Sequence, residues 1–486
     1  MEEREGRLEK LRAWREEGMN PYPTRAERTH TIEEALANFE ELHTAEQEIT
    51  LVGRVMLARD MGKTTFMHIE DGTGRMQVYF RRDEVGEQAY AGVRRLDIGD
   101  IIQATGHLFA TKTGERTLKV HRFRLLSKAL LSLPAKYHGL HDVDLRYRKR
   151  YLDLIANRDD VLPVFVTRSK AISAMRRYLD AHGYLEVETP TLQTLYGGAT
   201  ARPFVTHHNA LDRTLYLRIA DELYLKRLIV AGIERVYEIC KDFRNEGVDR
   251  THQPEFTMME CYQAYGDYEQ IMRLVEEMIA EVAIASRGTT RISYQGSEVN
   301  LEPPWPRIKL REAIAEFTSI EVERFPDRDS LAAAMRERGY EADEKLGRGR
   351  LIDDLKSQMM KRGFAPLKRA LFLTDYPLDV SPLAKQREDD PTTVERFQPF
   401  YGGLEGGNAY TELNDPLEQR ARFEDQARQR ARGDEEAQVL DEDFLEALEH
   451  GMPPTGGLGI GIDRLAMFLT DQETIRDVML FPTLRD

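Results

Sequence analysis

Hydrophobic and polar residues alternate along residues 235–262, which read RVYEICKDFRNEGVDRTHQPEFTMMECY. A period of two predicts β-strands with one buried face, so we expect two strands joined by a long charged loop. Phe256, Glu260 and Tyr262 fall on one face of the second strand. The loop adds two arginines, a glutamate and a histidine: Arg244, Arg250, Glu246 and His252. Two interpretations stay open, a surface hairpin with a solvated tip or one wall of a site for a ligand with positive and polyphosphate parts.

A different pattern runs from residue 49 to about residue 127, with five short strands separated by turns and a helical stretch between the third and fourth. This pattern predicts a small closed barrel of the OB type. On its surface, Phe66 offers a ring on which a base can stack, while Arg54 and Gln77 offer hydrogen-bonding groups. Because such barrels also bind sugars or peptides, RNA binding is one of several open interpretations.

The second half of the chain predicts an α+β domain. A helix over residues 161–182 ends at Gly183 and is followed by a strand that stops near Pro190. Further strands alternate with helices, and the hairpin connections favour a largely antiparallel sheet with helices packed against it. We expect a helical segment at 1–45, the barrel at 46–130, a linker at 131–150 and the larger domain at 151–486, with a helical insertion at about 305–365.

Polar residues recur on a second strand of this domain. Asn408, Tyr410 and Glu412 share one strand face, and Glu222 begins a helix after another strand. An isolated polar face is usually solvated, but two such strands together with Glu222 would crowd carboxylates and require a cation.

A glycine-rich strand, GGLGIGIDR, leads into a helix near residue 463. It is not the dinucleotide-binding fingerprint, because Ile462 occupies the place of the third glycine. The glycines would let a nucleotide approach the backbone, and Arg464 on the first helical turn could reach a phosphate or stack on a purine. The same arrangement also arises from packing alone.

Composition narrows the class of protein. A chain of 486 residues exceeds one compact core, so two or three domains are expected. The net charge of -15 argues against indiscriminate nucleic-acid binding but allows a local basic face. The two cysteines, Cys240 and Cys261, have no zinc-type spacing, and neither a signal peptide nor a membrane-length apolar run is present. We therefore expect a cytoplasmic protein that does not enter membranes.

Three segments in this order resemble the motifs of the class II aminoacyl-tRNA synthetases: the helix and strand ending at Pro190, FRNEG with THQPEFTMMECY, and GGLGIGIDR. Within that class the chain is similar to the lysyl-tRNA synthetases through ADELYLKRL, GGATARPF and NAYTELNDP. The resemblance implies a homodimer built on the first segment. It also implies activation of L-lysine by ATP with Mg²⁺, release of pyrophosphate, and transfer of lysine to the 3′ end of its tRNA.

The resemblance also implies roles for individual residues. Arg244 and Arg464 would be catalytic. The expected ATP-binding residues are Arg244, Glu246, His252, Phe256, Glu405 and Arg464. The expected lysine-binding residues are Gly198, Glu222, Arg244, Glu260, Tyr262, Asn408, Tyr410 and Glu412. In the barrel, Arg54, Phe66 and Gln77 would read the anticodon.

Two departures from the family pattern stand out. Gln398 replaces a glutamate that helps to bind magnesium, which leaves Glu405 as the one carboxylate of that pair. In the loop, Thr251 separates Arg250 from His252, whereas many bacterial members place an arginine directly before the histidine. A non-catalytic homologue and a protein-modifying paralogue are the alternatives, and the intact barrel argues against the second.

Overall fold

The computed structural model describes residues 2–134, 140–344, 346–364, 368–431 and 439–485. Residues 135–139 of the expected linker, and residues 345 and 365 of the expected insertion, lie outside the described residues. The chain separates into two compact units, residues 1–142 with 151–157, and residues 143–150 with 158–486. No helix in the described ranges combines the length and apolar character that a membrane span requires.

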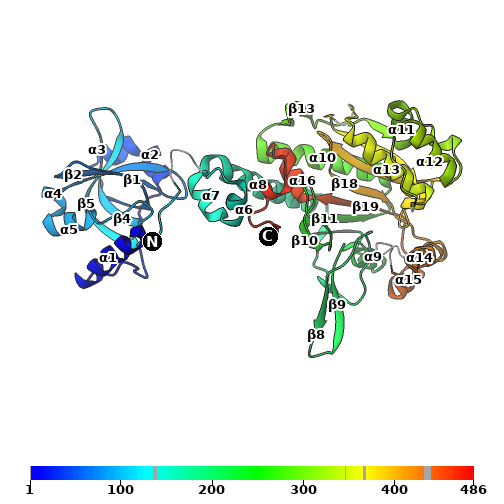
Figure 1. The fold of residues 1–486 in the computed structure, drawn as a ribbon, viewed down its shortest axis with the longest axis horizontal. Helices are drawn as coiled ribbons and strands as arrows, with labels where there is room; N and C mark the ends of the chain where they lie inside the picture. The colour runs from blue at the N-terminus through cyan, green and yellow to red at the C-terminus, as the bar shows by residue number, and fades with distance from the viewer. Residues whose placement is uncertain (1, 135–139, 345, 365–367, 432–438, 486) are drawn as a thin grey trace. The chain divides into compact units, whose positions relative to one another are not determined.

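A closed five-stranded barrel forms the first unit, together with short helices (Figure 1). The strands pair in the order β1-β2-β3-β5-β4. They are β1 (Ile49–Asp60), β2 (Thr64–Glu70), β3 (Arg75–Arg81), β4 (Ile101–Ala110) and β5 (Arg116–Ser127). The helices are α1 (Glu2–Glu16), α2 (Ile32–Ala37), α3 (Phe39–Thr44), α4 (Arg82–Val85) and α5 (Glu87–Val93). Alternate residues such as Ile69, Val78 and Phe80 fill the interior, which confirms the predicted OB-type barrel.

A nine-stranded, mostly antiparallel sheet forms the second unit, as the sequence predicts. Its order is β14-β15-β16-β18-β19-β11-β10-β6, and β17 pairs with β16. The strands are β6 (Leu185–Glu186), β10 (Arg235–Phe243), β11 (Glu255–Ala264), β14 (Arg307–Lys309), β15 (Leu371–Pro377), β16 (Thr393–Tyr401), β17 (Leu404–Glu405), β18 (Gly407–Thr411) and β19 (Thr455–Gly461). Among the strands in the described part of this sheet, only β14 and β6, at its two edges, pair in parallel with their neighbours.

Helices cover both faces of this sheet (Figure 1). One hydrophobic core lies under α9 (Glu222–Val230), α11 (Leu310–Thr318), α12 (Arg328–Glu337), α13 (Arg348–Lys361) and α15 (Glu442–Glu449). A second core, on the opposite face, lies under α8 (Arg158–Ala181), α10 (Tyr268–Arg287) and α16 (Ile462–Leu469). The strands β10, β11, β15, β16 and β18 contribute residues to both cores, on opposite faces of the sheet.

Smaller elements complete the second unit. They are α6 (Val143–Arg148), α14 (Pro416–Ala431), β7 (Leu192–Gln193), β8 (Val205–His208), β9 (Arg213–Leu217), β12 (Arg291–Tyr294) and β13 (Ser297–Asn300), while α7 (Arg150–Ala156) falls almost entirely in the first unit. Short 3₁₀ turns lie at Val322–Arg324, Leu378–Val380 and Ile475–Val478. Arg150, from the basic run expected in the linker, is buried and donates hydrogen bonds to the carbonyl oxygens of Arg476 and Met479. The charge of this arginine therefore caps backbone carbonyls within the second unit.

Candidate active site

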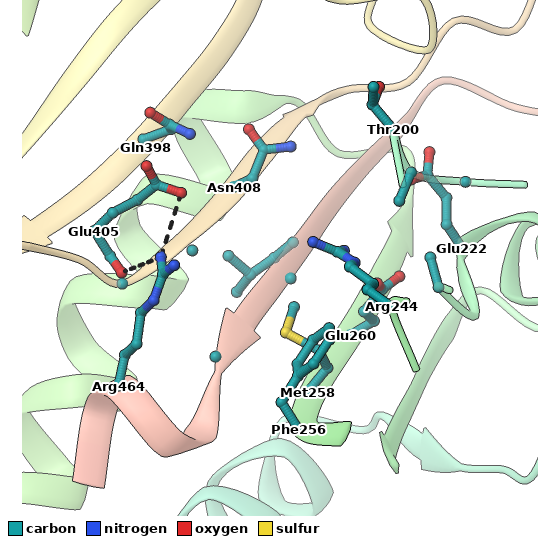
Figure 2. Close-up of a pocket in the computed structure, with 18 of the residues that line it drawn as sticks. Thr200, Glu222, Arg244, Phe256, Met258, Glu260, Gln398, Glu405, Asn408 and Arg464 are labelled. Carbon is teal, nitrogen blue, oxygen red and sulfur yellow. Dashed lines mark hydrogen bonds and ion pairs between the residues drawn. The ribbon is translucent and has the colours of Figure 1, made fainter. Parts of the chain in front are cut away.

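A cavity of about 410 Å³ opens over the centre of the large sheet. The residues that line it come from the hairpin β10–β11, the strands β16, β17, β18 and β19, the beginnings of helices α9 and α16, and the segments 198–200 and 380–384 (Figure 2). All the residues expected from the sequence to meet ATP, lysine or magnesium are among those that line it. They are Gly198, Glu222, Arg244, Glu246, His252, Phe256, Glu260, Tyr262, Gln398, Glu405, Asn408, Tyr410, Glu412 and Arg464.

The hairpin forms one wall through the alternation that the sequence predicts. Strands β10 and β11 pair antiparallel over their whole length, and β11 continues the sheet to β19. Phe256, Glu260 and Tyr262 face the cavity, while Met259 and Cys261 pack in the core on the opposite face. The hairpin is thus the wall of a cavity, and the interpretation as a merely solvated tip is wrong for β11.

Cationic groups stand at the entrance of the cavity. The Arg244 guanidinium lies 5.0 Å above the centre of the Phe256 ring, and its Nε donates a hydrogen bond of 3.3 Å to the Ile219 carbonyl oxygen. Arg464 lies at the other side of the cavity and contacts Glu405, with Nη1 at 3.6 Å from Oε1 (Figure 2). Two guanidinium groups on separate elements therefore face a shared space, which suits a polyanion or a carboxylate.

His252 connects the loop to Arg464. Its Nε2 lies 3.0 Å from Arg464 Nη2, and its Nδ1 lies 2.8 Å from Asp249 Oδ2. An arginine only donates hydrogen bonds, so Nε2 is the acceptor and Nδ1 carries the proton. The Asp249 carboxylate also accepts from the backbone N–H of Thr251. Although partial burial raises the pKa of Asp249, these hydrogen bonds lower it below its ordinary value.

The rest of the loop is more exposed. Glu246 lines the cavity but remains largely in solvent. Arg250 forms an ion pair of 2.9 Å with Glu473 and is not among the described residues that line the cavity. Thr251 lines the cavity in its place. The unusual order of Arg250 and Thr251 therefore directs this arginine to a surface ion pair.

Three glutamates gather at the closed end of the cavity. Glu260 accepts a hydrogen bond of 2.9 Å from the Tyr262 hydroxyl, and Glu222 accepts one of 2.5 Å from the Tyr410 hydroxyl. Glu412 is buried, and its Oε1 has no hydrogen-bond partner among the described residues. Buried carboxylates of this kind favour a bound cation, because an unpartnered acceptor is costly.

Burial and mutual repulsion act on the protonation of this end. Burial raises the pKa of Glu260 well above its ordinary value, and the neighbouring carboxylates Asp221, Glu222 and Asp242 raise it further. Burial also raises the pKa of Asp242, to about 6, against the opposing effects of nearby arginines. A cation that enters the cavity would relieve this repulsion, so the site is electrostatically prepared for a positively charged group.

Two glycines make room for the acidic end. A Cβ on Gly457 would lie 2.0 Å from Glu412 Oε1, which is far inside contact distance. Gly198 has a φ of +84°, and a Cβ there would press on the Cβ of Glu222 at 3.1 Å. A side chain at Gly457 would force Glu412 to move, and one at Gly198 would strain the backbone beside Glu222.

The residues at the expected magnesium position fit the ion in part. Gln398 Oε1 already accepts hydrogen bonds from Lys356 Nζ at 3.2 Å and from the Tyr376 hydroxyl at 2.5 Å. Its amide oxygen is therefore turned away from a metal. Glu405 lies beside the cavity and keeps a carboxylate for an ion. Because Mg²⁺ is commonly held by one or two carboxylates and the phosphates of its ligand, Glu405 alone is a sufficient protein contribution.

Sequence reasoning missed Arg396 and Lys226. Arg396 lines the cavity from β16, and its Nε donates a hydrogen bond of 2.7 Å to Asn408 Oδ1. Its position two residues before Gln398 on a strand was the available signal. Lys226 lies one helical turn after Glu222, and its Nζ is 2.6 Å from Glu222 Oε1 and in contact with Glu412 Oε2. The spacing of four residues was the signal here.

The barrel carries a separate candidate surface. Phe66 and Gln77 lie on the outer side of neighbouring strands, and the Phe66 ring packs 4.7 Å from that of Tyr79. Gln77 Nε2 donates a hydrogen bond of 2.8 Å to Glu115, a residue that the sequence did not single out. Arg54 donates to the Gly99 carbonyl oxygen at 2.9 Å. Aromatic rings beside amide and carboxylate groups suit stacking and base-edge contacts with an unpaired nucleotide.

The chain resembles known proteins over nearly its whole length. A family model described as tRNA synthetases class II (D, K and N) matches residues 142–485, and one described as an OB-fold nucleic acid binding domain matches residues 49–126. A lysine–tRNA ligase of Chloroflexus aurantiacus is 54% identical over 482 residues, with 99% of this chain and 97% of the relative covered. The lysine–tRNA ligase of Roseiflexus castenholzii is 52% identical over 481 residues, with 99% and 98% covered. That of Bacillus subtilis is 49% identical over 484 residues, with 99% and 96% covered.

Proposed function

The chain belongs to the class II tRNA synthetases of the D, K and N group, and we propose that it activates L-lysine with ATP and attaches it to lysine tRNA. The observation that carries the choice of lysine is the closed end of the cavity, where Glu222, Glu260 and Glu412 converge. An amino acid with a second ammonium group supplies the cation that these carboxylates require.

The two ends of the cavity would bind different chemical groups of the substrates. Arg244 and Arg464 would bind the lysine carboxylate and the ATP phosphates, with Phe256 and Arg464 on either side of the adenine. The lysine ammonium groups would lie among the glutamates and the hydroxyls of Tyr262 and Tyr410. A lysine carboxylate is already ionised at neutral pH, so its attack on the α-phosphorus needs no general base. The attack forms lysyl-adenylate and releases pyrophosphate, and the enzyme contributes alignment and positive charge.

Magnesium is part of the proposal, with Glu405 as its protein ligand. When bound, the ion would neutralise charge on the ATP phosphates. Arg464 contacts the same carboxylate through Nη1, 3.6 Å from Glu405 Oε1. Glu405 would therefore connect the cation and the guanidinium at one edge of the nucleotide site.

The barrel and the edge of the large sheet complete the assembly. Phe66, Gln77 and Arg54 would contact the anticodon of lysine tRNA.

A homodimer would form through α8 and β6, where the apolar side chains of Val166 and Leu185 are 42% and 53% exposed. Apolar groups exposed at a sheet edge are typical of interaction surfaces. Since charged tRNA is consumed by the ribosome, the reaction would take place in the cytoplasm.

Lysine-dependent exchange of pyrophosphate into ATP tests the activation step. We expect exchange with lysine and magnesium, and its loss in Arg244→Ala, because that arginine would hold both reacting groups. Arg250→Ala is the matched control in the same loop, since its guanidinium pairs with Glu473, and it should retain exchange. Absence of lysine-dependent exchange in the wild type would refute the proposal. Exchange without charging of lysine tRNA would favour the protein-modifying alternative.

A further inference from the structure

Lys226 is a fully buried lysine behind the candidate lysine site. It lies on α9, its relative exposure is 0%, and its Nζ contacts Glu222 Oε1 and Glu412 Oε2. Both glutamates line the cavity, whereas Lys226 is not among the described residues that line it. The ammonium group therefore contacts the two carboxylates from the protein side and leaves their other faces to the cavity.

The charges at this end of the cavity do not balance. Glu222, Glu260 and Glu412 supply three carboxylates, and Lys226 supplies one ammonium group in contact with two of them. With all three carboxylates ionised, two negative charges remain. An amino acid such as lysine brings two ammonium groups, while its carboxylate is left for Arg244. Asp221 and Asp242, which repel the Glu260 carboxylate, add to this negative charge, so the pocket attracts a substrate that carries two ammonium groups.

We propose that Lys226 is a positioning and specificity-determining residue, which holds Glu222 and Glu412 in place and opposes a proton shared between them, so that the pocket selects an amino acid with two ammonium groups. The inference rests on the proposed function. It assigns no contact between Lys226 and the substrate, because the carboxylates lie between them. Its physical basis is that two buried carboxylates close together share a proton unless a cation holds them.

The electrostatics agree with this role. Burial lowers the pKa of Lys226, but Glu222 and Glu412 outweigh burial and raise it above its ordinary value, so the ammonium stays charged. Burial and the neighbouring Glu222 raise the pKa of Glu412 well above its ordinary value, and Lys226 opposes that rise. The other titratable groups that face this cluster are Glu260 and Tyr262 on β11 and Tyr410 on β18. Without Lys226, only a proton could balance the paired carboxylates before substrate arrives.

The experiment compares the KM for lysine in pyrophosphate exchange between pH 6 and pH 8, in the wild type and in Lys226→Met. We expect a nearly constant KM in the wild type. In Lys226→Met we expect a KM at least about tenfold higher at pH 6.5 that falls as pH rises, because a shared proton must leave before the substrate ammonium binds. The KM for ATP should change by less than about threefold, since Lys226 contacts Glu222, Glu412 and Tyr410, none of which is assigned to ATP.

Two further variants separate positioning from folding. Lys128→Met removes a lysine that is equally buried between two carboxylates in the barrel, and it should leave the lysine KM and its pH profile unchanged. Lys226→Gln carries the same prediction as Lys226→Met if the methionine variant does not fold.

The outcomes are distinguishable. A wild type without lysine-dependent exchange refutes the proposed function. The wild type could support exchange while its KM for lysine already falls about tenfold per pH unit. This result would show that Lys226 does not prevent Glu222 and Glu412 from sharing a proton, so it would overturn the role of Lys226 and leave the proposed function intact. An unchanged KM and a flat profile in the folded Lys226 variants overturn it as well.

Discussion

Each unit of the molecule buries one lysine between two carboxylates, and the two clusters differ in what surrounds the carboxylates. In the barrel, Lys128 Nζ lies 2.7 Å from Asp97 and 2.9 Å from Asp100. Lys10 contacts the other oxygen of Asp97, and the backbone N–H of Ala129 donates to Asp100. Each carboxylate oxygen of this pair has a donor, and two ammonium groups balance the two negative charges.

The pocket cluster lacks this completion. Lys226 serves two glutamates, Glu260 adds a third carboxylate, and Glu412 Oε1 has no hydrogen-bond partner among the described residues. A cluster in which every carboxylate oxygen has a donor stabilises the fold. A cluster with unsatisfied oxygens is less stabilising, but those oxygens can bind a ligand. The number of unsatisfied acceptors therefore separates a structural ion pair from a substrate site built from the same residue types.

The largest effect is expected from Lys128→Met. Removal of this cation leaves the buried Asp100 without an ammonium partner and Asp97 with Lys10 alone, and loss of one partner from a buried pair costs about 3–5 kcal/mol. Thermal and denaturant unfolding should show a strongly destabilised barrel. The KM for lysine in exchange should stay at the wild-type value, and a clear rise in that KM would break the distinction between the two clusters.

A smaller effect, confined to the substrate, is expected from Glu412→Gln. The neutral amide keeps the shape but removes a charged acceptor, and such a hydrogen bond contributes about 1.5–3 kcal/mol. The KM for lysine should rise about 10- to 150-fold. Unfolding should change little, because the lost carboxylate was partly unpartnered. Strong destabilisation without a change in KM would assign Glu412 to the fold.

Much of this fold was predictable from the sequence, because the period at which hydrophobic residues recur indicates which side of a strand or helix is buried. Alternation located the hairpin, the barrel strands and the polar face of Asn408, Tyr410 and Glu412, and the structure brings all the expected site residues of the larger unit to one cavity. It did not reveal Lys226 or Arg396, because a charged residue on a helix or strand is usually solvated and only the fold shows which charges are buried. It also could not show that Lys356 and Tyr376 occupy the Gln398 oxygen, which depends on contacts between distant segments.

The barrel should affect tRNA but not amino-acid activation. Phe66→Ala removes one ring of the Phe66–Tyr79 pair, and stacking of a base on an aromatic ring contributes about 1–3 kcal/mol. The kcat/KM for charging lysine tRNA should fall about 5- to 150-fold. Exchange in the absence of tRNA should be unchanged. An equal loss in both assays would show that Phe66 acts through folding.

The smallest effect is expected on the stability of Asp242→Asn, measured as a function of pH. Because burial raises the pKa of Asp242 to about 6, the folded state holds its proton more tightly than the unfolded state, and stability falls as pH rises from about 4 to about 6. Asp242→Asn should therefore stabilise the protein at pH 7.5 by about 1 kcal/mol, less than the full shift implies because Arg218 loses a charged partner. The gain should vanish near pH 4.

The contribution of Asp97 in the barrel to stability depends on pH in the opposite direction. Burial raises the pKa of Asp97, but hydrogen bonds from Lys10 and Lys128 outweigh it and lower the pKa below the ordinary value. Its contribution to stability is therefore present at neutral pH and lost as pH falls through the lowered pKa. Asp97→Asn should destabilise the protein at pH 7.5, and unfolding followed over pH measures both variants. Two variants that shift stability in the same direction at pH 7.5 would contradict the contrast between the clusters.

The most direct test compares lysine with norleucine, which has the same carbon chain without the terminal ammonium, in pyrophosphate exchange by the wild type. If Glu222, Glu260 and Glu412 exist to receive that ammonium, lysine will support exchange and norleucine will leave the buried carboxylates unpaired. The predicted discrimination in kcat/KM is at least about 10⁴-fold, as for sites built to bind a polar group that the analogue lacks. Comparable exchange with the two amino acids would contradict the account.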